Sequence, residues 1–182
     1  MEKIILDLCG GTGAWSNPYK DAGYDVRLVT LPDNDVRLFK PPNNVYGILA
    51  APPCTVFSLA GNWVKRTDAE MIEALSIVDA CIRIIYKSKP KFWALENPVG
   101  KLKRYLGEPV LRFHPCDYGD AYFKRTCLWG NFKVPKKNPI ECPKIPYSKT
   151  PIGRLGGKSE RTKMLRSITP QGFAKAFYEV NK

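Results

Sequence analysis

A cysteine that follows two prolines is the first residue of this sequence that could do covalent chemistry. Cys54 lies in residues 50–58 (AAPPCTVFS), directly after an apolar run that predicts a strand. Two prolines end a strand and restrict the backbone that aims the next residue, and ligand sites of α/β proteins lie at the carboxyl ends of strands. A thiolate in that place can act as a nucleophilic catalyst. A buried structural thiol is the alternative, because that is the usual state of a free cysteine.

A carboxylate at the end of a later predicted strand is the second candidate. Glu96 closes the apolar run 91–96 (KFWALE) and is followed by Asn97-Pro98. A partly desolvated carboxyl group in such a place can donate a proton to a bound substrate. A solvated carboxylate without a chemical role is the alternative interpretation.

A glycine-rich turn after the first predicted strand is the third candidate. Residues 6–13 (LDLCGGTG) run from an apolar strand into the turn. Glycine lets the backbone approach a bound nucleotide closely at the carboxyl end of a strand. The pattern is not GxGxxG, and no GK[ST] follows, which argues against a phosphate-binding P-loop. The turn therefore indicates a nucleotide-related ligand, with a purely structural turn as the alternative.

The segments that carry these residues alternate between predicted strands and helices. Strands are expected at 3–9, 25–31, 46–51 and 91–96. A helix is expected to open at Thr67, with Glu70 completing a capping box. Its apolar face is formed by residues at helical spacing, namely Met71, Leu75, Val78, Ile82 and Ile85. This alternation predicts an α/β fold with a mostly parallel sheet.

The last third of the chain has a different composition. Residues 132–163 are rich in Pro, Lys and Gly, which indicates an extended basic segment. A final short helix is expected from Thr169-Pro170, with proline at the favoured first position. Its apolar side would be Phe173, Ala176 and Phe177.

Composition limits the class of protein. The 182 residues, 44% of them hydrophobic, suit one domain with a real core. The 29 Lys and Arg against 17 Asp and Glu give a net charge of +12, which favours a polyanionic partner such as nucleic acid; an idle basic surface is the alternative. No apolar run approaches the ~20 residues that span a bilayer, and the first residues are too few and too acidic for a signal peptide. We therefore expect a cytoplasmic protein that does not bind membranes.

Six cysteines lack CxxC pairs, so reduced thiols are expected. Four side chains could in principle hold zinc: His114, Cys116, Cys127 and Cys142. Their spacing matches no established zinc pattern, and no metal is expected.

The order of these motifs resembles that of the DNA cytosine-5 methyltransferase family, in the compact form found in phage genomes. Residues 7–13 (DLCGGTG) resemble its cofactor motif DLFxGxGG, and residues 50–58 resemble its nucleophile motif GxPPCQxFS. Residues 95–98 (LENP) resemble its ENV motif, and residues 117–129 (DYGDAYFKRTCLW) its YGxPQxRxR motif. Residues 166–170 (RSITP) are similar to its RxLTPxE motif.

The resemblance implies a Rossmann-like fold that uses S-adenosylmethionine, and transfer of a methyl group to carbon 5 of cytosine in DNA. It implies that Cys54 is the nucleophile and that Glu96 binds or protonates ring nitrogen 3, with Asn97 and Arg125 as the other catalytic residues. The residues expected to bind the cofactor are Asp7, Cys9, Gly11, Thr12, Gly13, Asp35 and Pro52. Those expected to contact nucleic acid are Ser58, Trp63, Lys65, Arg66, Lys124, Lys136 and Lys137.

The same resemblance predicts how the chain is organised. A methyltransferase catalytic core would span residues 1–130, a short basic DNA-contacting segment residues 131–165, and a C-terminal helix packing on the core residues 166–182. Because the basic segment is too short for an ordinary recognition domain, we expect short or relaxed sequence specificity. The protein would act in a bacterial or phage-infected host cell.

The sequence departs from the family pattern at two places and leaves other functions open. Val29-Thr30-Leu31 stands where the family has an acidic residue for the ribose, and Cys127 occupies the place of the second arginine. Methylation of cytosine in RNA is the nearest rival activity. Modification of free nucleotides is a third reading, against which the charge of +12 argues. A catalytically weak DNA-binding or cofactor-binding module is the alternative from another class.

Overall fold

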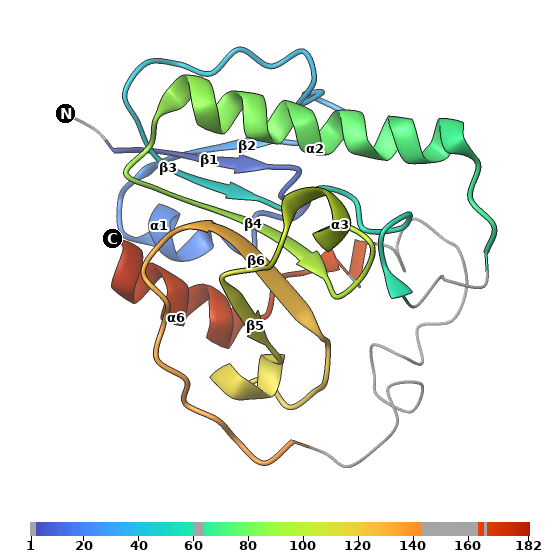
Figure 1. Ribbon diagram of the computed structural model, residues 1–182. Helices are drawn as coiled ribbons and strands as arrows, with labels where there is room; N and C mark the ends of the chain where they lie inside the picture. The colour runs from blue at the N-terminus through green and yellow to red at the C-terminus, as the bar shows by residue number, and fades with distance from the viewer. Residues whose placement is uncertain (1–2, 60–63, 143–163, 166) are drawn as a thin grey trace.

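The computed structural model describes residues 3–59, 64–142, 164–165 and 167–182, and its centre is a β-sheet covered by helices on both faces (Figure 1). In chain order the elements are β1 (Ile4–Leu8), α1 (Asn17–Asp21), β2 (Asp25–Val29), β3 (Val45–Ala50), α2 (Asp68–Ser88), β4 (Phe92–Pro98), α3 (Lys103–Leu106), β5 (Leu111–Phe113), the 3₁₀ helix η2 (Pro115–Tyr118), β6 (Thr126–Asn131) and α6 (Gln171–Asn181).

The sheet of the described residues has six strands in the order β2-β1-β3-β4-β6-β5. The four strands from β2 to β4 are parallel, whereas β6 is antiparallel to β4 and β5 is antiparallel to β6. The expected α/β fold with a mostly parallel sheet is therefore confirmed. The four strands expected from sequence are present with shifts of one or two residues at their ends.

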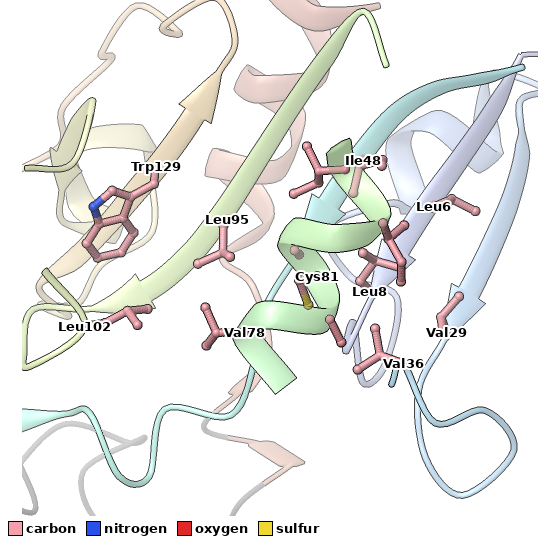
Figure 2. Close-up of a cluster of buried hydrophobic side chains, with 14 of the residues drawn as sticks. Leu6, Leu8, Val29, Val36, Ile48, Val78, Cys81, Leu95, Leu102 and Trp129 are labelled. Carbon is pink, nitrogen blue, oxygen red and sulfur yellow. The ribbon is translucent and has the colours of Figure 1, made fainter. Parts of the chain in front are cut away.

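Helix α2 covers one face of the sheet. Its start is the expected capping box, in which the Thr67 hydroxyl accepts the Glu70 amide at 3.2 Å and the Glu70 carboxylate accepts the Thr67 amide at 2.8 Å. Figure 2 shows Val78 and Cys81 of this helix against strand side chains, including Leu95.

The face of α2 that packs on the sheet is rotated by about one residue relative to the apolar face predicted from the sequence. Met71, Leu75 and Ile82 lie at the edges of the contact and are only partly buried. The residues that face the sheet include small ones, and a helix can approach a sheet closely through small side chains. The buried residues of α2 are Ala74, Val78, Ala80, Cys81, Ile84 and Ile85.

Helices α1 and α6 cover the opposite face (Figure 1). Aromatic side chains form most of the core on that face. Phe173 of α6 stacks on Phe113 of β5 with ring centroids 4.1 Å apart, and Phe177 meets Trp15 edge-on at 5.5 Å. The predicted final helix is confirmed, but Pro170 is its N-cap and not its first helical residue. The Pro170 carbonyl accepts the Ala174 amide at 2.9 Å, so the helix begins one residue later than expected.

The described part of the expected basic segment runs beside η2. The Asn138 amide donates to the Asp117 carbonyl at 2.9 Å, and the Tyr118 hydroxyl donates to the Pro135 carbonyl at 3.2 Å. The remainder of that segment, residues 143–163, lies outside the described residues, as does Trp63. Among the helices that are described, none is both long and apolar enough to cross a bilayer.

Candidate active site

Three chain segments meet at one edge of the sheet because the strands that precede them are parallel. Leu8 at the end of β1 pairs with Ala50 of β3, and Ala50 pairs with Leu95 of β4. The Ala51 amide continues the pairing and donates to the Leu8 carbonyl at 2.9 Å. The glycine turn, the Pro-Pro-Cys segment and the Glu-Asn pair therefore leave the sheet side by side, as the sequence suggested (Figure 1).

The segment around Cys54 is a tight turn with one buried anchor. The Cys54 carbonyl accepts the amides of Phe57 at 3.0 Å and Ser58 at 2.8 Å. The Phe57 side chain is fully buried. The Phe57 carbonyl in turn accepts the Lys101 amide at 2.7 Å, which ties the turn to the chain that follows β4.

Glycine at position 100 is required by this close approach, which sequence reasoning missed. A Cβ atom on Gly100 would lie 2.0 Å from the Phe57 carbonyl oxygen. Ser58, which was expected to contact nucleic acid, forms an isolated bridge with Gly100 and is partly buried. The turn after Cys54 and the segment after β4 thus pack backbone against backbone.

Asn97 holds the cysteine segment to β4. Its side chain is fully buried, and its amide group donates to the Pro52 carbonyl at 2.9 Å. The Asn97 Oδ1 atom has no hydrogen-bond partner in the described part of the chain. Through this one bond, Asn97 fixes the residue two positions before Cys54.

Cys54, Glu96 and Lys124 are the ionisable side chains that interact at this edge of the sheet. Burial raises the pKa of the Cys54 thiol, the Glu96 carboxylate raises it further, and the Lys124 ammonium acts in the opposite direction. The Lys124 Nζ atom lies 3.9 Å from Glu96 Oε1. A thiol beside a shielded carboxyl group can attack an electron-poor ring carbon while the carboxyl group binds or protonates a ring atom.

The glycine turn rests on a buried carboxylate. Asp7 is fully buried and accepts a 2.5 Å hydrogen bond from the Ser16 hydroxyl. Burial raises the pKa of Asp7 to about 6, against the lowering effect of Ser16. A Cβ atom on Gly10 would lie 2.1 Å from the Asp7 Oδ1 atom, so glycine is needed there. The buried Asp7 side chain therefore packs against the glycine turn. Its hydrogen-bond donor, Ser16, lies nine residues later and was not predicted from the sequence.

Part of the glycine turn is exposed to solvent. Gly11 and Thr12 are exposed, whereas Gly13 is buried. Cys9, Gly11 and Gly13 all have positive φ angles, of 57°, 57° and 73°. Glycine adopts this conformation without strain at positions 11 and 13, whereas Cys9 adopts it with a side chain.

Asp35 is held by a neighbouring cation. The Arg37 guanidinium donates to both Asp35 carboxylate oxygens, at 2.6 to 3.1 Å, and lowers the pKa of that carboxyl group. Arg37 also pairs with Glu73 of α2. Asp35 is only partly exposed, and the ion pair between Arg37 and Glu73 ties its loop to α2.

The other residues expected to contact nucleic acid differ in how far they are engaged by the rest of the chain. Lys65 is exposed, and Arg66 pairs with Glu70 at 3.0 Å and donates to the Thr55 carbonyl at 3.4 Å. Lys136 is exposed, whereas Lys137 pairs with Asp117 at 3.0 Å.

Arg125, the residue after Lys124, faces a different cavity. Its side chain is exposed and lines a pocket of about 260 Å³ together with Arg112, His114 and Lys137. The Glu96 carboxylate has its ion pair, among the described residues, with Lys124. In the described part of the chain, no three His, Cys, Asp or Glu side chains converge as metal ligands would.

Comparison with known proteins agrees with this geometry. Residues 14–111, which include Cys54 and Glu96, match the family of C-5 cytosine-specific DNA methylases. The chain is 30% identical over 202 aligned positions to the type II methyltransferase M.DdeI of Desulfomicrobium norvegicum, covering 91% of this chain and 43% of that protein. It is 34% identical over 53 positions to the type II methyltransferase M.SacI of Streptomyces achromogenes, covering 29% and 14%.

The fold has a counterpart among solved structures. A protein described as a candidate DNA modification methyltransferase, encoded within an E. coli prophage, superimposes with a TM-score of 0.52 at 18% identity, covering 71% of this chain and 47% of that one. The chain thus spans less than half the length of the relatives it matches. The matched region, the α/β sheet and the three segments at its edge together show that the chain belongs to the C-5 cytosine-specific DNA methylase family.

Proposed function

We propose that this chain transfers a methyl group from S-adenosylmethionine to carbon 5 of cytosine in DNA, with Cys54 as the covalent nucleophile. The observation that carries the proposal is the placement of Cys54 just after β3 and of Glu96 near the end of the adjacent parallel strand β4, where the Glu96 carboxylate raises the pKa of the Cys54 thiol. The glycine turn after β1 opens at the same edge.

The chemistry follows from the poor nucleophilicity of carbon 5 of cytosine. The Cys54 thiolate adds to carbon 6, while Glu96 hydrogen-bonds or protonates ring nitrogen 3 and so favours the addition. Carbon 5 then has enamine character and would form a bond to the methyl group as the bond between that methyl group and the cofactor sulfur breaks, which leaves the demethylated cofactor as the leaving group. Loss of the carbon 5 proton and departure of the Cys54 sulfur restore the aromatic ring and the free enzyme.

The residues present fit S-adenosylmethionine as cofactor. The exposed Gly11 and Thr12 form a surface without bulky side chains beside the catalytic edge. Asp35, fixed by Arg37, is a carboxylate within the loop that follows β2. Thr30 follows β2 directly, so the ribose is not bound by an acid at that position. When bound, the cofactor supplies an electrophilic methyl group.

DNA fits the charge and the chemistry of the site. The net charge of +12 favours a polyanion. The target base must leave the duplex stack to reach a thiol that is partly buried. Exposed lysines such as Lys136 suit phosphate contacts, which carry no sequence information directly. We therefore propose short or relaxed sequence specificity.

Incubation with labelled S-adenosylmethionine and DNA, RNA or dCMP in parallel tests this function. The proposal expects label at carbon 5 of cytosine in DNA, and none in DNA incubated with the Cys54→Ala variant. Transfer to RNA alone would assign the rival substrate, and transfer to dCMP alone would assign free nucleotides. Absence of transfer to all three, with the fold intact, would favour a binding module.

A further inference from the structure

Lys124 approaches the catalytic edge from the segment before β6. Because β6 runs antiparallel to β4, with Pro98 opposite Thr126, the residues just before β6 return past the end of β4. The Lys124 Nζ atom lies 3.9 Å from Glu96 Oε1, and the two side chains are only 21% and 16% exposed. The Oε1 atom has no hydrogen-bond partner among the described residues, so the ammonium group is the charge that this oxygen faces.

The same ammonium group acts on the nucleophile. Lys124 favours the thiolate of Cys54, whereas burial and the Glu96 carboxylate disfavour it. A thiolate beside an ionised carboxylate would place two negative charges in a partly desolvated site, and like charges raise each other's energy there. The Lys124 ammonium group, 3.9 Å from the Glu96 carboxylate, offsets this repulsion before the base is bound, and so favours the Cys54 thiolate that the proposed attack on carbon 6 requires.

Other cations near the edge are engaged elsewhere. Arg66 reaches the Thr55 carbonyl but pairs with Glu70. The exposed Arg125 lines the neighbouring pocket together with Lys137, and Lys137 pairs with Asp117. Among the cations of the described residues, Lys124 is the one that pairs with Glu96.

We propose that Lys124 is a positioning residue of this active site, which holds the Glu96 carboxylate and supports Cys54 as the thiolate. The proposal rests on the proposed function for the reaction that Cys54 performs. It assigns the ammonium group to the interior of the site, where the sequence had suggested a contact with nucleic acid, and it makes reactivity of Cys54 depend on a residue that is distant in sequence.

Alkylation of Cys54 tests this directly and needs neither DNA nor cofactor. The full chain is treated with iodoacetamide at several pH values around the range of cysteine thiols, and the Cys54 peptide is quantified by mass spectrometry. Only the thiolate reacts, so loss of the cation in the Lys124→Met variant should slow alkylation about tenfold at neutral pH, as expected for removing a close opposite charge. The Lys124→Arg variant should stay within about threefold of the wild type, because it keeps the charge.

Matched variants complete the design. Lys175→Met removes an exposed lysine of α6 and should leave the alkylation rate unchanged. Glu96→Gln removes the opposing carboxylate and should accelerate alkylation. Thermal melting checks the fold, and Lys124→Gln replaces Lys124→Met if that variant does not fold. A rate in the uncharged Lys124 variant within about twofold of the wild type, against the expected effect of a close charge, would overturn the proposal. This result is independent of methyl transfer, so failure of the proposed function is recognised separately in the parallel substrate assay.

Discussion

Replacing Asn97 with alanine should damage catalysis more than it damages the fold. The Asn97 amide donates a 2.9 Å hydrogen bond to the Pro52 carbonyl and is fully buried. Removing the donor leaves that carbonyl without this partner, at a typical cost of about 1–3 kcal/mol. Removal of the unpartnered Oδ1 atom offsets part of this cost. At about 2–4 °C per kcal/mol for a chain of this size, a cost of about 1–3 kcal/mol lowers the melting temperature by about 2–12 °C before that offset.

The effect on rate follows from position. Pro52 lies two residues before Cys54, and a displacement of reacting groups by about 1 Å can cost roughly 10²-fold in rate. Initial rates of methyl transfer from labelled cofactor to DNA measure kcat, and differential scanning fluorimetry measures stability. Asn138→Ala is a matched control, because Asn138 is exposed and its hydrogen bond to Asp117 comes from the backbone. Asn97→Asp should lower kcat at least as far, since a carboxylate cannot donate to Pro52. A kcat for Asn97→Ala within about threefold of the wild type, against the expected range, would refute the inference that the Asn97–Pro52 hydrogen bond positions Cys54.

Three further perturbations test other parts of the site. Gly100→Ala should destabilise the fold by about 1–3 kcal/mol or more and reduce methyl transfer, because its Cβ would lie 2.0 Å from the Phe57 carbonyl; unchanged melting would contradict this. The pKa of Asp7 rises from 3.8 to about 6 on folding, so its contribution to stability is present below the unfolded value and is lost as pH rises through about 6. The free energy of unfolding of Asp7→Asn should therefore exceed that of the wild type at neutral pH by up to about 3 kcal/mol, and this difference should disappear toward pH 4. A difference that does not change with pH would show that Asp7 does not titrate as described. Neutralising Lys136 should reduce the slope of log affinity for DNA against log salt by about 0.9, and neutralising Lys137 should reduce it less because Asp117 already pairs with it; equal reductions would contradict the pairing.

Local pattern was sufficient for the central part of the fold. The parallel strands are short apolar runs that end in glycine or proline, and the start of α2 carries its capping box in four consecutive residues, 67–70. Cys54 and Glu96 were predictable for the same reason. Cys54 follows β3 and Glu96 lies near the end of β4, so the pairing of these two strands also brings the two residues to the same edge of the sheet.

The remaining features depend on residues that are distant in sequence. The antiparallel β5 and β6 were not expected, since Leu111–Phe113 is too short to show a period and its register is set by β6. The pair between Glu96 and Lys124 exists only because β6 returns along β4. The burial of Asp7 likewise depends on Ser16 beyond the glycine turn. The cofactor and DNA contacts expected from the resemblance stay predictions for the assays above.

Covalent trapping on DNA that contains 5-fluorocytosine tests the central claim most directly. Fluorine at carbon 5 blocks the final elimination, so the enzyme should remain bonded to the base through Cys54 in the presence of S-adenosylmethionine. The complex should survive denaturation, and peptide mapping should place the base on Cys54. The Cys54→Ala variant should form no adduct while its fold, followed by thermal melting, is retained. A wild-type protein that methylates DNA without ever forming this adduct, or a Cys54→Ala variant that turns over at the wild-type rate, would contradict the account.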